Sequence, residues 1–284
     1  MRTVLRSAKQ EVAIDKSARF VVIGEKINPS VGKRLAVALR ERNYDYVREL
    51  ARKQVAAGAD VLDVNVGLSD ADEVRLLPET VRIITEVVEI PVCIDSQSPA
   101  ALAAALSVTP GKPLVNSTDG QEASLQAVLP VVKDYGAAVV GLTMDEDGIP
   151  INAEGRLAIA EKILEKASRM GVPAEDVVVD PLVLSVGADS NAAVVTLRAI
   201  ARIRKTLGVN ISLGASNVSF GLPDRHSLNQ AFLALAIGAG ATCAITDPTK
   251  MTTVVRAVDL LMGRDRRAMR YLRHWRARQG SEPG

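Results

Sequence analysis

Short runs of apolar residues recur along the chain, and many of them end on a small polar side chain. VLDVN ends at Asn65, VCID at Asp95 and VVVD at Asp180. LVN and LGASN end in the same way at Asn116 and Asn217. Runs of β-branched residues of this length are typical of buried parallel strands. The pattern therefore predicts a parallel sheet that carries polar side chains at the carboxyl ends of its strands.

The predicted strands alternate with predicted helices over most of the chain. The strands are Phe20–Gly24, Val61–Val66, Val92–Asp95, Pro113–Asn116, Ala137–Leu142, Val177–Asp180, Ile211–Ala215 and Ala241–Ile245. The helices are Tyr44–Ala57, Glu79–Val88, Pro99–Ala105, Glu122–Asp134, Arg156–Met170, Ala192–Thr206, Leu228–Ala239 and Thr252–Met262. Such alternation predicts βαβ units and an α/β fold. Eight repeats favour a closed (β/α)8 TIM barrel, and a doubly wound open sheet is the alternative.

We expect one domain, because the sequence contains no linker and no low-complexity tract. A length of 284 residues with 48% hydrophobic content suits a single large domain over residues 1–284. Its barrel core is predicted over about residues 18–262, and glycines end four predicted helices at Gly58, Gly136, Gly171 and Gly238.

The tail Arg264–Gln279 is strongly basic and predicts an extra C-terminal helix, about residues 264–279. Met269, Leu272 and Trp275 would form its apolar stripe. We expect either a solvated helix docked on the barrel or a contact surface for an acidic partner or a second subunit.

Composition narrows the class of protein. A net charge of +2 and an aromatic content of 3% argue against a nucleic-acid partner. Two cysteines, Cys93 and Cys243, make neither a disulfide scaffold nor a zinc cluster, and two histidines exclude a His-rich metal site. The N-terminus lacks the apolar core of a signal peptide, and no segment reaches the about 18 apolar residues of a membrane span. We expect a cytoplasmic enzyme with no membrane partner and no protein-bound metal.

The polar strand ends would surround one mouth of the barrel, where ligands bind in this fold. The predicted set is Glu25, Asn28, Asp63, Asn65, Asp95, Asn116, Thr143, Met144, Asp145, Asp180, Ser216, Asn217, Thr246 and Asp247. Any one of them could be a turn or capping residue, but capping does not require a single acidic ring. Carboxylates accept hydrogen bonds and amides both donate and accept, so a flat heterocycle such as a pterin fits this ring. Mg²⁺ is the alternative, although tighter carboxylate pairs would then be expected.

Seven segments at these positions resemble the pterin-binding barrel family, and most closely the methyltetrahydrofolate:corrinoid-protein methyltransferases. They are IGEKIN (Ile23–Asn28), LDVNVG (Leu62–Gly67), CIDS (Cys93–Ser96), VNST (Val115–Thr118), GLTMDEDGIP (Gly141–Pro150), VVDPLV (Val178–Val183) and GASNVSFGLPDRHSLN (Gly214–Asn229). The segments run in family order. The resemblance implies methyl transfer between N5 of tetrahydrofolate and the cobalt of a corrinoid (cobalamin) on a separate protein. It also implies a homodimer.

The resemblance assigns roles residue by residue. Asp95, Asn116 and Asp180 match the residues that hold the pterin ring, and Gly214 and Ser216 match the turn beside it. Asn217 matches the asparagine that hydrogen-bonds the reactive N5 region, which implies a catalytic role. Arg225 matches an arginine near the distal part of the folate. Supporting positions behind this set are expected at Asn28, Asp63, Asn65, Asp145 and Phe220.

Two relatives differ at informative positions. Phe220 stands where the acetogenic methyltransferases have glutamine, but the folate domain of cobalamin-dependent methionine synthase has phenylalanine there too. Dihydropteroate synthases carry a lysine where this chain has Asn217. A dihydropteroate synthase-like condensing enzyme and a non-catalytic folate-binding protein remain the alternative functions.

Overall fold

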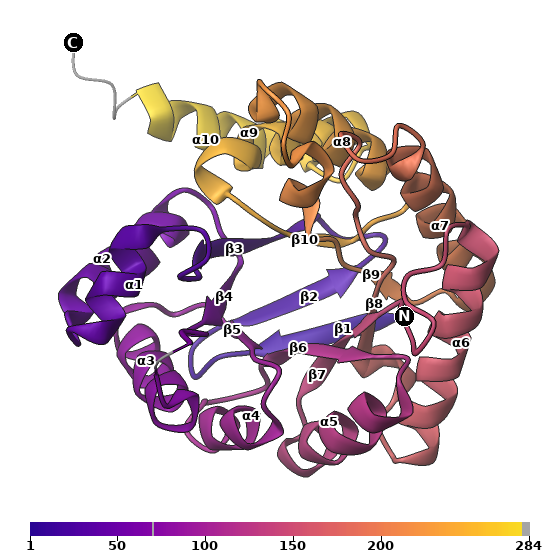
Figure 1. The fold of residues 1–284 in the computed structure, drawn as a ribbon. Helices are drawn as coiled ribbons and strands as arrows, with labels where there is room; N and C mark the ends of the chain where they lie inside the picture. The colour runs from indigo at the N-terminus through magenta and orange to yellow at the C-terminus, as the bar shows by residue number, and fades with distance from the viewer. Residues whose placement is uncertain (70, 280–284) are drawn as a thin grey trace.

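Eight parallel strands form a ring at the centre of the computed structural model, which describes residues 1–69 and 71–279 (Figure 1). They are β3 (Val21–Ile27), β4 (Val61–Asn65), β5 (Val92–Asp95), β6 (Leu114–Asp119), β7 (Ala138–Leu142), β8 (Val177–Asp180), β9 (Asn210–Ile211) and β10 (Cys243–Thr246). The ring closes between β9 and β10, where Gly214 and Ile245 form a parallel bridge and the Ile245 N–H donates to the Leu213 carbonyl at 2.8 Å. This closed barrel confirms the predicted fold and excludes the open sheet.

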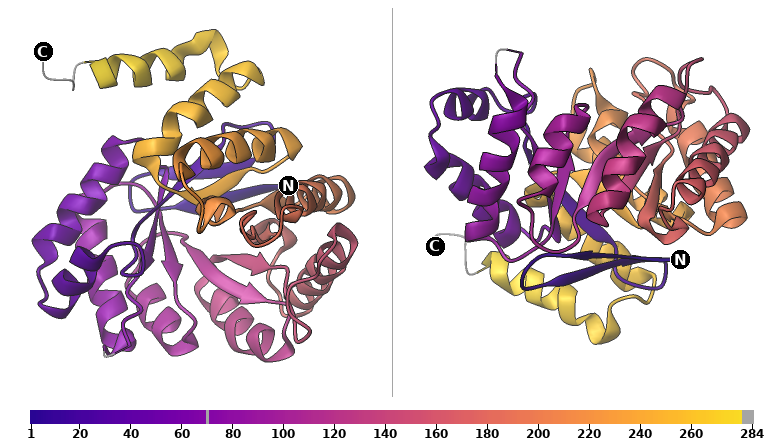
Figure 2. Two further views of the ribbon diagram at one scale, coloured as in Figure 1. Left: turned by 45° about the horizontal axis from the view of Figure 1, so that its top comes forward. Right: turned by 90° about the horizontal axis from the view of Figure 1, so that it is seen from below.

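Helices surround the ring on its outer side (Figures 1 and 2). They are α1 (Lys33–Arg40), α2 (Tyr44–Ala56), α3 (Glu73–Val87), α4 (Pro99–Leu106), α5 (Glu122–Tyr135), α6 (Ala153–Arg169), α7 (Ala192–Leu207), α8 (Arg225–Ala239) and α9 (Pro248–Leu261). Their apolar faces are buried against the strands or against neighbouring helices; on α6, Ile159, Ala160 and Ile163 are buried at the spacing of one helical face. Short 3₁₀ turns occur at η1 (Ala174–Asp176), η2 (Ala215–Ser219) and η3 (Arg266–Ala268).

The strands alternate between two cores. Outward residues such as Leu62 and Ile94 pack under the helices, whereas inward residues such as Val61 and Cys93 fill the barrel. Because side chains alternate along a strand, the inward row of each strand continues upward to its last residues. Polar residues at those ends therefore point into the mouth of the barrel.

An N-terminal hairpin closes the opposite end of the ring, and the sequence patterns did not predict it. Strands β1 (Arg2–Arg6) and β2 (Glu11–Asp15) pair antiparallel and cross the ring, as Figure 2 shows. Leu5, Val12 and Ile14 are buried against the inward barrel residues. The barrel core thus includes residues before the predicted start near residue 18.

Several predicted boundaries move. The predicted strand at Ile211–Ala215 shrinks to β9, because the chain turns into η2 at Ala215. Gly58, Gly136 and Gly171 follow helices with positive φ, as predicted. Gly238 does not; it lies inside α8, and Gly240 at φ 120° ends that helix, because an L side chain rarely adopts this backbone conformation.

The basic tail forms α10 (Met269–Gln279), preceded by η3. Arg270 Nη1 lies 3.2 Å from Asp259 Oδ2, and His274 Nε2 lies 3.0 Å from Thr253 Oγ1. These polar contacts hold the helix on α9. None of the described α10 residues is buried, and the predicted stripe Met269, Leu272 and Trp275 is exposed. A partner for this face stays a prediction. Residues 280–284 of the predicted domain, and Asp70, lie outside the described residues.

We predict that Ile14→Ala lowers the free energy of unfolding by about 2–5 kcal/mol, because the side chain is fully buried and its removal leaves a cavity. Denaturant unfolding measures this loss. Val194→Ala, at an exposed position on α7, serves as control and should change stability by less than about 0.5 kcal/mol. Equal effects of the two substitutions would show that the hairpin is not part of the core.

Candidate functional site

The carboxyl ends of the strands meet at the end of the barrel that the hairpin leaves open. A hollow of about 490 Å³ lies there, formed by the ends of β3 and β10, the turn η2 and the first residues of α8 and α9. Its lining residues are Glu25, Lys26, Ser30, Val31, Ser216, Asn217, Phe220, Arg225, His226, Asn229, Asp247, Lys250 and Met251.

Two ring-holding candidates, Asp95 and Asn116, lie on adjacent strands. Asn65 on β4 lies opposite Asp95 on β5, and Asp95 lies opposite Asn116 on β6. Across the mouth, Asp180 ends β8 beside Leu142 of β7. These inward positions form one polar layer at the top of the barrel core.

Asp63 lies one layer deeper, because it is two residues before Asn65 on the same inward row. It is almost completely buried, and the Asn116 side-chain amide donates to its Oδ1 at 3.3 Å. Burial, and secondarily the charge of Asp95, raises the pKa of Asp63 well above its usual value. Asp63 thus orients Asn116 from below.

Burial also perturbs the carboxyl groups of the upper layer. It raises the pKa of Asp95 to about 6, against a hydrogen bond from Asn65 that lowers it. Burial raises the pKa of Asp180 to about 7, although the backbone N–H groups of Leu182 and Gly214 and the charge of Arg156 favour its ionised form. Perturbed carboxyls gathered in one cleft are characteristic of functional sites.

The turn that carries Asn217 is held by several contacts. The Ser216 hydroxyl donates to Glu25 Oε2 at 2.9 Å, and Arg225 Nη2 donates to the Ser216 carbonyl at 2.8 Å. A Cβ on Gly214 would lie 3.0 Å from Asn217 Nδ2, so glycine lets the amide fold over the backbone. The Asn217 side chain is exposed to the hollow and has no hydrogen bond within the described residues. It is therefore available to a ligand.

Of the remaining predicted residues, two lie at the rim of the hollow and two stabilise their own turns. Arg225 lies over the ring of Phe220, 6.0 Å from its centroid, and Phe220 is 70% exposed at the rim. Asn28 and Asp145 are not brought into the set. Asn28 accepts a bond from the Ser30 N–H, and Asp145 accepts one from the Asp147 N–H, so both brace their own turns.

The sequence placed Glu25 and Asp247 at the mouth without a specific role, and it missed two basic side chains, Lys26 and Arg156. Lys26 forms an ion pair with Asp247 at 2.8 Å. Arg156 is buried and donates to the carbonyls of Pro181 and Leu182 at 2.7 and 2.8 Å, which supports the loop after Asp180. Their partners lie far away in sequence, so no local signal could have found these contacts.

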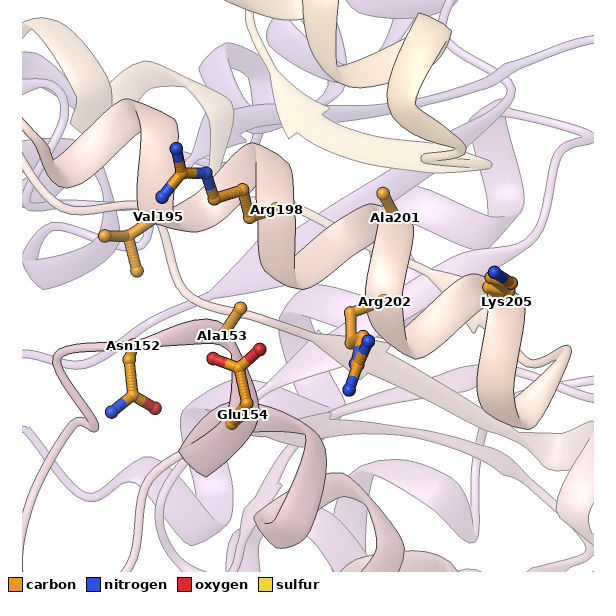
Figure 3. A pocket seen from close by; sticks show the side chains of 8 residues that line it. All are labelled: Asn152, Ala153, Glu154, Val195, Arg198, Ala201, Arg202 and Lys205. Atoms are coloured by element: carbon orange, nitrogen blue, oxygen red, sulfur yellow. The ribbon is translucent and has the colours of Figure 1, made fainter.

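A second hollow of about 410 Å³ lies outside the barrel between α6 and α7 (Figure 3). Its lining residues are Asn152, Ala153, Glu154, Val195, Arg198, Ala201, Arg202 and Lys205. Arg198, Arg202 and Lys205 of α7 contribute cations to it, and Glu154 of α6 contributes a carboxylate. No strand end lines this hollow, so it lies apart from the polar layer at the mouth of the barrel.

Two further observations concern metals and membranes. Within residues 1–69 and 71–279, no group of three or more His, Cys, Asp or Glu residues could hold a metal ion. The absence of a protein-bound metal stays a prediction. In the same part of the chain, every helix is too short or too polar to cross a bilayer.

Comparison with known proteins gives a consistent result. The family described as pterin binding enzyme matches residues 27–247. The methylcorrinoid:tetrahydrofolate methyltransferase of Eubacterium limosum is 31% identical over 262 residues, which cover 90% of this chain and 96% of that protein. Methionine synthase of Mycobacterium tuberculosis is 29% identical over 272 residues, covering 88% of this chain but only 23% of that protein.

Solved structures share the fold. A Yersinia pestis DHPS with a pterine-sulfa conjugate superposes with a TM-score of 0.71 at 16% identity, covering 93% of this chain and 100% of that chain. The dihydropteroate synthase of Thermus thermophilus gives 0.66 at 20% identity, covering 92% and 99%. At such identities the likeness concerns the barrel alone.

We predict that Asp180→Asn makes the free energy of unfolding less dependent on pH. A carboxyl whose folded pKa is raised contributes stability below its unfolded pKa and loses it as pH rises through the folded value, here about 7. Between pH 4 and 8 the wild type should therefore lose about 4 kcal/mol more unfolding free energy than the variant. Denaturant midpoints at the two pH values measure the difference, and parallel pH curves would contradict the prediction.

Proposed function

Because the chain belongs to the pterin-binding enzyme family, we propose that it is a methyltransferase that moves a methyl group between N5 of tetrahydrofolate and the cobalt of a corrinoid on a separate protein. One observation carries the proposal: the Asn217 amide, which has no hydrogen-bond partner among residues 1–69 and 71–279, faces the hollow in a chain that matches a methylcorrinoid:tetrahydrofolate methyltransferase over nearly its whole length. By resemblance, the condensing dihydropteroate synthases have a lysine at this position.

The layer of Asp95, Asn116 and Asp180 holds the pterin ring. Each ionised carboxylate accepts from an amino group or a ring N–H, and the Asn116 amide matches an edge that both donates and accepts. Asp63 engages one hydrogen of the Asn116 amide, so the amide oxygen is left with a defined direction. The ring is thereby oriented with its reactive nitrogen toward η2.

Asn217 contacts the N5 region. A tertiary amine is a poor leaving group unless N5 gains a hydrogen bond or a proton as its bond to the methyl carbon breaks. An amide can rotate to donate or to accept, so Asn217 follows N5 through both states. Contacts that strengthen in the transition state raise the rate rather than the affinity.

The corrinoid partner approaches from the open mouth. Phe220 and Arg225 stand on the rim beside Asn217, where an incoming corrinoid would meet them. A homodimer and a cytoplasmic location are part of the same proposal by resemblance. A non-catalytic folate-binding protein is the competing function, and it would bind tetrahydrofolate without changing the corrin spectrum.

We predict that Asn217→Ala lowers methyl transfer at least about 100-fold while folate affinity changes less than about threefold, since a transition-state contact is lost. Corrin absorbance with methylcobalamin and tetrahydrofolate measures turnover, and calorimetry measures binding. Asn191→Ala removes an exposed asparagine that makes no side-chain cap on α7 and should leave both values unchanged. Wild-type turnover in Asn217→Ala would refute the assignment.

We predict that folate affinity rises between pH 5 and pH 8. The carboxyls with pKa values of about 6 at Asp95 and about 7 at Asp180 must ionise to accept hydrogen bonds from the ring. Asp180→Ala should weaken binding at least about tenfold at pH 8, and by less at pH 5, where the wild-type carboxyl is already protonated. A pH-independent difference in calorimetric Kd would rule out this role for Asp180.

A further inference from the structure

Methyl transfer to folate requires an acceptor for a proton. Tetrahydrofolate carries a hydrogen on N5, and its methylated form does not. When the N5 lone pair forms the new bond to the methyl carbon, the cobalt–carbon bond breaks with its electron pair left on cobalt, and the N5 proton must leave. The opposite direction consumes one proton at N5. The neutral amide of Asn217 can hydrogen-bond N5, but it has no proton to exchange near neutral pH.

We propose that Glu25 exchanges this proton with N5 through the hydroxyl of Ser216; the inference rests on the proposed function. Ser216 Oγ lies 2.9 Å from Glu25 Oε2 and 3.2 Å from Oε1. Ser216 also directly precedes Asn217, and all three residues line the same hollow. The hydroxyl thus connects the carboxyl to the place where Asn217 meets N5.

The side chain of Glu25 and the turn that carries Ser216 are both held in place by the fold. Glu25 follows the inward residues Val21 and Ile23 on β3, so it projects over the filled barrel core. The Ser216 carbonyl accepts from Arg225, which also donates to Ser219 Oγ at 3.1 Å. These contacts fix the rotation of the turn, and the Ser216 hydroxyl is left directed at Glu25.

The surroundings of Glu25 suit proton exchange. Burial raises the pKa of Glu25 most, the hydrogen bond from Ser216 lowers it, and the charges of Lys26 and Arg225 oppose that of Asp247. The charged or titratable groups that face it are Lys26 on its own strand, Asp63 of β4, Arg225 and His226 of α8, Asp247 after β10, and Lys250 of α9. A carboxyl whose pKa burial raises takes up a proton more readily than an exposed carboxyl, which suits an exchange of protons with a substrate.

The other carboxyl groups near the mouth are already engaged. Asp247 pairs with Lys26 and accepts from the Thr249 N–H at 3.0 Å, and its pKa is lowered although burial opposes this. Asp95 and Asp180 serve the ring, and Asp63 lies below them. His226 is the rival proton carrier, since it lines the hollow and lies 3.0 Å from Gln230.

The exchange is balanced in both directions. As folate is methylated, N5 gives its proton to Ser216 Oγ while the hydroxyl hydrogen of Ser216 passes to the Glu25 carboxylate. In the opposite direction the Glu25 carboxyl returns a proton through Ser216, and N5 keeps the electron pair of the broken bond to the methyl carbon. Each cycle therefore leaves Glu25 to equilibrate with solvent.

The test is the pH profile of kcat at saturating tetrahydrofolate with methylcobalamin as the methyl donor. Wild-type kcat should rise with pH as the Glu25 carboxyl ionises. Glu25→Gln keeps the size of the side chain and an oxygen that accepts from Ser216, but it cannot take the proton. We expect it to lower kcat at least about 30-fold and to abolish the rising limb, with folate Kd changed less than about threefold. Glu25→Asp, which retains a carboxyl, should restore the limb in part.

Companion variants separate proton exchange from other roles. Ser216→Ala should match Glu25→Gln, and the double variant should be no slower than either single one, because the two groups act as a unit. His226→Gln should keep the rising limb. The inference is overturned if Glu25→Gln retains the limb, if its defect lies in KM alone, or if His226→Gln removes the limb. If the wild-type protein shows no turnover, both the proposed function and this inference are refuted. If the wild type is active and Glu25→Gln has the same kcat and pH profile, only the inference is refuted.

Discussion

Closure of the barrel between β9 and β10 is the constraint on which the site depends. β9 contains only Asn210 and Ile211, so the ring is completed beyond it by the Gly214–Ile245 bridge. The chain can then leave the sheet at once, and η2 begins at the next residue. Asn217 therefore lies on a short turn that begins directly after the last bridge of the ring, so the proposed reactive side chain has a rigid base.

The closed ring also explains the electrostatics of the mouth. The hairpin fills one end with Leu5, Val12 and Ile14, so the inward carboxyls at the other end rest on an apolar column. Burial on that column raises the pKa values of Asp95 and Asp180 toward neutrality. Their ionised forms are costly in the protein without ligand, and such a cost is expected at a site where binding recovers the energy.

The site divides into two parts with different chemistry. The strand ends of β5, β6 and β8 form a polar layer, which holds the pterin ring in the proposed function. The turn η2 and the end of β3 form the part that would decide which reaction follows. Asn217, Ser216 and Glu25 belong to this second part, where a hydrogen bond joins Ser216 on the turn to Glu25 on β3. One barrel can therefore support different reactions by changing the turn alone.

The sequence by itself determined the barrel and the polar strand ends at its mouth, and the family resemblance singled out Asp95, Asn116, Asp180 and Asn217 among them as candidates. The barrel and the strand ends follow from local patterns, because strand periodicity and the polar end of a parallel strand are visible in consecutive residues. Only the tertiary structure decided the contacts of Glu25 with Ser216, 191 residues away, and the hairpin that plugs the ring. A pairing between distant segments, and a short strand that is buried only by docking on a finished barrel, leave no signal in any local stretch of sequence.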